Sequence, residues 1–165
     1  MKLVAGLGNP GEEYFKNRHN TGFIIVDDFA SKNGLSWENS SKFNAEIAIS
    51  KNFILAKPQT FMNNSGESVS KILSFYKIDI GNLLIIHDDV DLQFGEIKKQ
   101  LGSSSAGHKG VESVIEKLGS QDFWRIRIGI GRPEDKNIPT DDWVLQDFKE
   151  EELKKIKSIS SEIVF

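Results

Sequence analysis

The sequence predicts an α/β protein with a single domain, a three-layer sandwich in which helices flank a twisted, mixed β-sheet. Strand-like and helix-like segments alternate along the 165 residues in an order that is typical of this class. Residues 83–86 form a continuous apolar run, which is typical of a strand covered on both faces. The chain contains no internal repeat, low-complexity segment or linker, so we expect residues 1–165 to form one domain.

The first half of the chain predicts three strands and two helices. The expected elements are a buried strand (2–7), a helix (21–32), two strands (44–50 and 53–56) and a second helix (65–76). Both helices are expected because apolar residues recur at helical spacing. Asn33-Gly34 is a stop signal for the first helix and Ser65 a cap for the second. Lys51-Asn52 joins the two middle strands, which indicates a hairpin.

The second half predicts three strands, two helices and two loops. The expected elements are strands over 82–87, 95–101 and 124–130, helices over 108–118 and 150–164, a small-residue loop over 102–107 and a mobile polar loop or lid over 132–142. In the last strand, Ile126, Ile128 and Ile130 alternate with charged or small residues, which indicates a half-buried strand. The last helix is expected to be amphipathic.

Composition excludes several classes of function. The chain has no cysteine, which excludes disulfides, thiolate catalysis and cysteine-based zinc sites and favours a cytoplasmic location. No apolar run approaches the roughly 18–20 residues that span a bilayer, so no membrane association is expected. The net charge is -3, but the charges are unevenly distributed: residues 97–132 include seven basic and three acidic residues. Such a patch can meet phosphates, but the chain is not a strongly basic nucleic-acid binder.

The N-terminal glycine motif has two interpretations. Gly6, Gly8 and Gly11 match the G-x-G-x-x-G pattern of dinucleotide-binding proteins. Pro10-Gly11 interrupts the helix which that fold requires, and the acidic pair Asp27-Asp28 falls within a helix rather than after a second strand. The motif therefore favours a tight turn at the end of the first strand over a nucleotide site.

His19 is the first candidate for chemistry. It follows a polar loop and precedes the expected helix, where solvent can reach it. A neutral imidazole is the natural general base near pH 7, provided that its other nitrogen has an orienting acceptor. The alternative is a surface or capping histidine.

The acidic run His87-Asp88-Asp89-Val90-Asp91, with four polar residues of which three are carboxylates, comes at the end of an apolar strand, at the edge where open α/β sheets bind ligands. Three interpretations remain open. The run is a charged exit from the strand, its carboxylates hold a divalent metal, or one aspartate fixes the tautomer of His19. The chain offers no second dense cluster of ligands, which argues against the metal.

Two loops complete the candidates. In Thr60–Gly66, two asparagines cap a helix or hold a substrate carbonyl beside an apolar wall of Phe61 and Met62. The loop over 102–110 is a flexible connector, or it presents backbone N–H groups to an anion. No Gly-x-Ser-x-Gly motif is present, so a serine-hydrolase mechanism has no support.

Together these motifs resemble the bacterial peptidyl-tRNA hydrolase family, in order from residue 2 to about residue 148. The matching blocks are Val4-Ala5-Gly6-Leu7-Gly8-Asn9-Pro10-Gly11 with Tyr14, Arg18-His19-Asn20-Thr21-Gly22, Pro58-Gln59-Thr60-Phe61-Met62-Asn63-Asn64-Ser65-Gly66, His87-Asp88-Asp89-Val90-Asp91-Leu92, Gly107-His108-Lys109-Gly110 and Arg125-Ile126-Arg127-Ile128-Gly129-Ile130-Gly131-Arg132-Pro133. Six collinear blocks are far more specific than any one of them.

The resemblance implies hydrolysis of the ester between a peptide, or an N-blocked amino acid, and the 3′ ribose of tRNA, which recycles tRNA from prematurely released peptidyl-tRNA. It implies His19 as the base, Asp88 as its orienting group and Asn9 as support for the catalytic centre. The other implied contacts are with substrate for Tyr14, Asn20, Phe61, Met62, Asn63 and Lys109, and with tRNA phosphates for Lys98, Lys99 and Arg127. It further implies a cytoplasmic monomer without metal, cofactor or obligate protein partner.

The sequence departs from the family pattern in three places. Lys109 stands where members usually carry asparagine, so either a lysine donor to an oxyanion or phosphate takes the place of the amide, or this position has no part in the chemistry. Gln100 stands where members often have a second lysine, which weakens a phosphate clamp unless Lys99 compensates. The chain also ends at Phe165, C-terminally short relative to the family, and its last segment is acidic.

Three rival functions remain. A non-catalytic RNA-binding relative is disfavoured by the presence of both His19 and Asp88. A nucleotide-dependent oxidoreductase is disfavoured by Pro10, and a metal-dependent peptidase by the scarcity of ligands.

Overall fold

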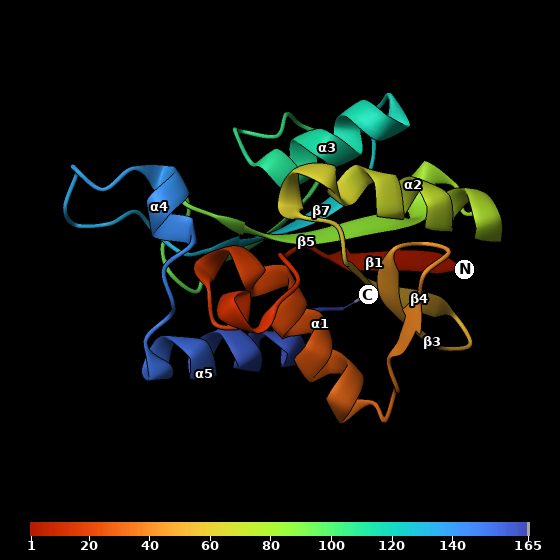
Figure 1. The fold of residues 1–165 in the computed structure, drawn as a ribbon, viewed down its shortest axis with the longest axis horizontal. Coiled ribbons are helices and arrows are strands. Elements are labelled where there is room, and N and C mark those ends of the chain that lie inside the picture. Colours follow the sequence, from red (N-terminus) through yellow and green to blue (C-terminus); the bar gives the residue numbers. More distant parts are fainter. Residues whose placement is uncertain (165) are drawn as a thin grey trace.

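The fold is a sheet of seven strands between two helical layers, as a computed structural model that describes residues 1–164 shows (Figure 1). The strands are β1 (Lys2–Gly6), β2 (Glu38–Ser40), β3 (Ala45–Ile49), β4 (Phe53–Pro58), β5 (Leu83–Asp89), β6 (Ile97–Leu101) and β7 (Trp124–Gly129). The helices are α1 (Thr21–Lys32), α2 (Ser65–Tyr76), α3 (Lys109–Leu118), α4 (Thr140–Val144) and α5 (Glu150–Ser158). The predicted single-domain α/β sandwich with a mixed sheet is confirmed.

The strand order is β2-β3-β4-β1-β5-β7-β6. The four central strands β4, β1, β5 and β7 run parallel, whereas β2, β3 and β6 pair antiparallel at the edges. The predicted hairpin of β3 and β4 is confirmed by the register that pairs Ile49 with Ile54. The carboxyl ends of the parallel strands therefore meet along one edge of the sheet.

Two apolar cores lie on opposite faces of the sheet. One packs α2 and α3 against alternate residues such as Leu3 and Ile85, and the other packs α1 and α5 against Val4 and Ile86. Figure 1 shows α2 and α3 together on one face and α1 and α5 on the other. Because both faces of β1 and β5 are covered, their continuous apolar composition is explained.

The segment predicted as a mobile loop, 132–142, instead leads into the short helix α4. This expectation was partly wrong, since residues 140–142 belong to the helix. Two residues of α4 anchor the segment. Val144 is buried, and the indole Nε1 of Trp143 donates to the carbonyl of Gly131 at 2.9 Å. The predicted last helix also ends earlier, at Ser158, and continues as a 3-10 turn over Ile159–Ser161.

Two smaller details differ from expectation. Strand β2 was not predicted, because its three polar residues carry no apolar alternation and only the pairing with β3 makes it a strand. Ser65 is the first residue of α2 and not its cap; its hydroxyl donates to the carbonyl of Met62 at 2.8 Å. Among residues 1–164, no helix has the length and apolar character needed to cross a membrane.

Candidate active site

The candidate residues gather where the parallel strands β4, β1 and β5 end. Asn9 follows β1, Met62 follows β4, and Asp88 is the second-last residue of β5. The chain leaves β1 for a helix on one face of the sheet and leaves β4 for a helix on the other face. Such divergence opens a crevice at the carboxyl edge, which is where α/β proteins bind ligands.

The glycines of the N-terminal motif bring α1 close to the sheet. A Cβ atom on Gly6 would lie 2.3 Å from the carbonyl oxygen of Gly22, in the first turn of α1, and one on Gly8 would lie 2.6 Å from the ring of Phe23. Only hydrogen fits at both positions, so the motif serves helix packing. His19, in the 3-10 turn Arg18–Asn20 before α1, is thereby held at the end of β1.

The C-terminal part of the chain fixes the same turn from outside. The guanidinium of Arg18 lies 3.6 Å from the ring centre of Trp143 and donates to the carbonyls of Gln146 and Asp147. The backbone N–H of Arg18 also donates to the carbonyl of Gln146 at 3.1 Å. Since Arg18 is 4% exposed, these contacts make the position of His19 depend on the segment after α4.

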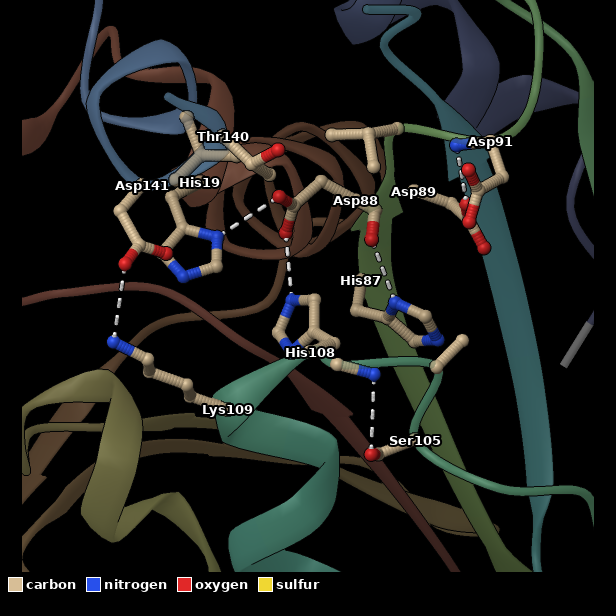
Figure 2. Close-up of a pocket in the computed structure, with 14 residues that line it drawn as sticks. His19, His87, Asp88, Asp89, Asp91, Ser105, His108, Lys109, Thr140 and Asp141 are labelled. Carbon is tan, nitrogen blue, oxygen red and sulfur yellow. Dashed lines mark hydrogen bonds and ion pairs between the residues drawn. The ribbon is translucent and has the colours of Figure 1, made fainter.

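Asp88 lies between two imidazoles (Figure 2). Its Oδ2 atom is 2.8 Å from Nδ1 of His19, and its Oδ1 atom is 2.9 Å from Nε2 of His108. The Asp88 side chain is buried, and a carboxylate can only accept, so both imidazoles donate to it. Nε2 of His19 is then left unprotonated when the ring is neutral.

His108 was not among the candidate residues that the sequence suggested. Its Nδ1 atom accepts from the backbone N–H groups of Gly110 and Val111, at 3.1 and 3.3 Å, and thus caps α3. The proton of the neutral ring must therefore be on Nε2, which faces Asp88. Its position, directly after a small-residue loop and before a helix, is the sequence signal for such a cap. The cap occupies the amide of Gly110, which the anion-binding interpretation of the loop over 102–110 would leave open, and that of the next residue, Val111.

Burial and charge act against each other at these groups. Burial lowers the pKa of His19, but the charge and hydrogen bond of Asp88 outweigh this effect, so the pKa is raised above its ordinary value. Burial raises the pKa of Asp88, and the two imidazoles outweigh it in turn, so the pKa of the carboxyl lies well below its usual range. In the folded protein, Asp88 is therefore ionised at neutral pH.

The other carboxylates of the acidic run have cationic partners. Asp89 pairs with Arg127 at 2.7 Å and Asp91 with Arg132 at 2.6 Å. Among residues 1–164, the group with metal-ligand character is instead His19, Asp88 and His108, whose ligand atoms lie within 4.8 Å of one another. In the present arrangement, the carboxylate oxygens of this group already accept hydrogen bonds from the two imidazoles.

Asn9 and Asn20 form a reciprocal pair. The backbone N–H of Asn9 donates to Oδ1 of Asn20, and Nδ2 of Asn20 donates to the carbonyl of Asn9, both at 2.9 Å. Oδ1 of Asn9 accepts from the backbone N–H of Met62 at 2.8 Å. Because this contact fixes the amide, the remaining Nδ2 group of Asn9 is a donor for the cavity that Asn9 lines.

Two cavities adjoin His19. One, of about 80 Å³, is lined by residues 105–107 and by Asp88. The other, of about 200 Å³, is lined by Asn9, Phe61, Met62 and Asn63. Four residues line both cavities: His19, Lys109, Asp141 and Val144. Tyr14 lines neither, and Asn20 contributes through its bonds to Asn9.

The three residues suggested for phosphate binding do not share one face of the sheet. Lys98 pairs in register with Arg127, whereas Lys99 pairs with the buried Ile126 and lies on the opposite face, 5.3 Å from the ring centre of Trp124. Gln100, on the face of Lys98, accepts from Arg127 at 2.7 Å. Lys99 therefore does not take the place of a lysine at position 100.

The comparisons with known proteins point to one family. The family model described as peptidyl-tRNA hydrolase matches residues 3–164. Peptidyl-tRNA hydrolase from Mycoplasmopsis agalactiae is 45% identical over 163 residues, which covers 99% of this chain and 85% of that protein. The one from Aliarcobacter butzleri is 44% identical over 159 residues, covering 96% and 86%. A solved structure of peptidyl-tRNA hydrolase from Acinetobacter baumannii superposes with a TM-score of 0.89 at 34% identity, covering 98% of this chain and 83% of that one.

Proposed function

The chain belongs to the peptidyl-tRNA hydrolase family and hydrolyses the ester bond of peptidyl-tRNA, and we propose that His19 is its general base. One observation carries this proposal. Asp88 accepts from Nδ1 of His19 at 2.8 Å, and His19 lines the cavity that Asn9 and Met62 also line. This contact fixes the tautomer that leaves Nε2 free to take a proton.

The reaction then proceeds in two proton transfers. Nε2 of His19 takes a proton from water as the water oxygen attacks the carbonyl carbon of the ester. The bond between this carbon and the ribose oxygen breaks, and the imidazolium returns the proton to the ribose oxygen as it leaves. The products are a peptide with a free carboxyl group and tRNA with a free 3′ hydroxyl, and no covalent enzyme intermediate forms. Asp88 stabilises the transient imidazolium without taking its proton.

Amide donors stabilise the charge that develops on the carbonyl oxygen. Nδ2 of Asn9 is fixed by the contact of its Oδ1 atom with Met62. Asn63 lines the same cavity. Such a donor is worth about 10²–10³ in rate. Phe61 and Met62 supply the apolar wall for the peptide, with Tyr14, Asn20 and Lys109 as further substrate contacts.

The phosphates of tRNA are assigned to the face of the sheet that carries Lys98 and Arg127. Both side chains lie on the side of α3, because Arg127 alternates with Ile126 and Ile128, which belong to the core on the opposite face. His108 and Lys109 stand at the start of that helix. We further propose a cytoplasmic monomer that requires neither metal nor cofactor.

Turnover of an N-blocked aminoacyl-tRNA tests the assignment. We expect hydrolysis to persist with a metal chelator, and we expect His19→Ala to abolish turnover while deacylated tRNA still binds. Equal turnover in the His19→Ala variant would exclude His19 as the base. Loss of activity on chelation would instead favour a metal at His19, Asp88 and His108.

A further inference from the structure

Lys109 and Asp141 face each other across the mouth of the crevice. Lys109 is the first residue of α3 and Asp141 the second residue of α4, and Nζ of the lysine is 3.6 Å from Oδ2 of the aspartate. Figure 2 shows the two side chains meeting beside His19. Both residues line both cavities that adjoin His19, so a substrate ester at His19 must lie against this ion pair.

The stability of the fold does not account for Lys109. The first turn of a helix is the positive end of its dipole, where a cation is unfavourable, and His108 already caps this helix. The side chains of Lys109 and Asp141 are 60% and 78% exposed. Exposed ion pairs of this kind contribute only about 0–1 kcal/mol, so another anion can displace Asp141 from the ammonium at little cost.

We infer that Asp141 holds the ammonium of Lys109 across the crevice in the free enzyme and yields it to an anionic oxygen of the substrate. This inference rests on the proposed placement of the ester at His19. Two anionic oxygens are available there, a phosphate of the terminal nucleotides and the oxyanion of the reacting carbonyl. In either case Asp141 is an internal competitor of the substrate, and it also keeps Lys109 positioned until substrate arrives.

Asp142 provides a matched control. It is also exposed, it follows Asp141 on α4, and it lines neither cavity. Asp141→Asn and Asp142→Asn remove the same charge from the same helix. Only the first frees Lys109, so a difference between the two variants reports the ion pair and not the net charge.

The test measures the dissociation constant of deacylated tRNA and the KM for an N-blocked aminoacyl-tRNA. If the anion is a phosphate, we expect Asp141→Asn to tighten both by about two- to fivefold and Asp142→Asn to have a clearly smaller effect. Lys109→Met keeps the aliphatic stem and removes the charge. In that background, Asp141→Asn should give no more than the effect of Asp142→Asn.

A substrate without phosphate distinguishes the two anions. The probe is the 3′ ester of adenosine with an N-acetylated amino acid. If Lys109 meets a phosphate, Asp141→Asn tightens the binding of tRNA, and its KM advantage over Asp142→Asn disappears on this ester. If it meets the oxyanion, Lys109→Met lowers kcat on this ester and Asp141→Asn raises it.

Two results would overturn the inference: equal effects of Asp141→Asn and Asp142→Asn on tRNA binding and also on the kinetics of both esters, or an advantage of Asp141→Asn that persists in the Lys109→Met background. The binding measurements with deacylated tRNA do not depend on turnover. A failure of His19 as the base would therefore be recognised separately, in the turnover of His19→Ala.

Discussion

Nε2 of His108 lies 2.9 Å from Oδ1 of Asp88, so a second imidazole holds the carboxylate that orients His19. Asp88 is buried and uses one oxygen for each ring. Rotation of the carboxylate would break both contacts at once. Since Nδ1 of His108 accepts from the amides of α3, the helix and the general base are coupled through the side chains of His108 and Asp88.

The coupling predicts that His108→Asn impairs catalysis without unfolding α3. Asparagine is among the best helix caps, but its shorter side chain does not reach Asp88. Losing one hydrogen bond to a buried carboxylate corresponds to roughly a tenfold fall in kcat. We expect KM and the urea midpoint to change little. An unchanged kcat, or a loss that follows the loss of stability, would show that His108 only caps the helix.

Asp88→Asn should shift the pH dependence of kcat/KM. The neutral form of His19 is the base, and Asp88 raises the pKa of His19. Without the carboxylate this pKa falls, so the acidic limb of the profile should move to lower pH while the maximum rate drops. Asparagine has one acceptor oxygen for two N–H donors, so one imidazole loses its partner. Profiles between pH 5 and 9 check the direction, and a shift to higher pH would contradict it.

The sequence located most of the scaffold because periodicity is a local signal. The bounds of α2 and α1 agree with the prediction, and the strands differ by one or two residues at their ends. The role of His108 was not predicted, because its contact with Asp88 depends on the path of the preceding loop, where Ala106 has a φ of 48°. Strand alternation alone predicts that Lys98 and Lys99 lie on opposite faces of the sheet. A count of charges along the sequence does not distinguish the two faces.

His87 predicts a specific loss of stability at mildly acidic pH. It is 2% exposed, and burial lowers its pKa from 6.5 to about 3. Its Nδ1 atom contacts the carbonyl of Asp88 at 2.7 Å, while Nε2 has no hydrogen-bond partner within residues 1–164. Below pH 6.5, His87 binds a proton in the unfolded chain but not in the folded chain. The free energy of unfolding therefore falls as the pH drops toward 3.

For this single group the loss between pH 7 and pH 5 is about 2 kcal/mol. The measurement is the free energy of urea unfolding at both pH values for the wild type and for His87→Gln, which does not titrate. His19 has a raised pKa and contributes with the opposite sign, but it does so in both proteins. The wild type should therefore lose more stability than the variant. Parallel losses would mean that His87 takes up a proton in the folded state.

Lys98 and Lys99 offer adjacent lysines on opposite faces of one strand, which makes each the control for the other. If tRNA phosphates meet the face that carries Lys98 and Arg127, Lys98→Ala should weaken binding of all tRNA species. It should also reduce the slope of log affinity against log salt by about 0.7–0.9, the value for one phosphate contact. Lys99→Ala removes the same charge, but Lys99 lies on the other face, over Trp124. The slope of log affinity against log salt should therefore stay at the wild-type value in this variant. Binding titrations at several salt concentrations decide between the faces, because equal slopes for both variants would show that phosphates respond to net charge and not to this surface.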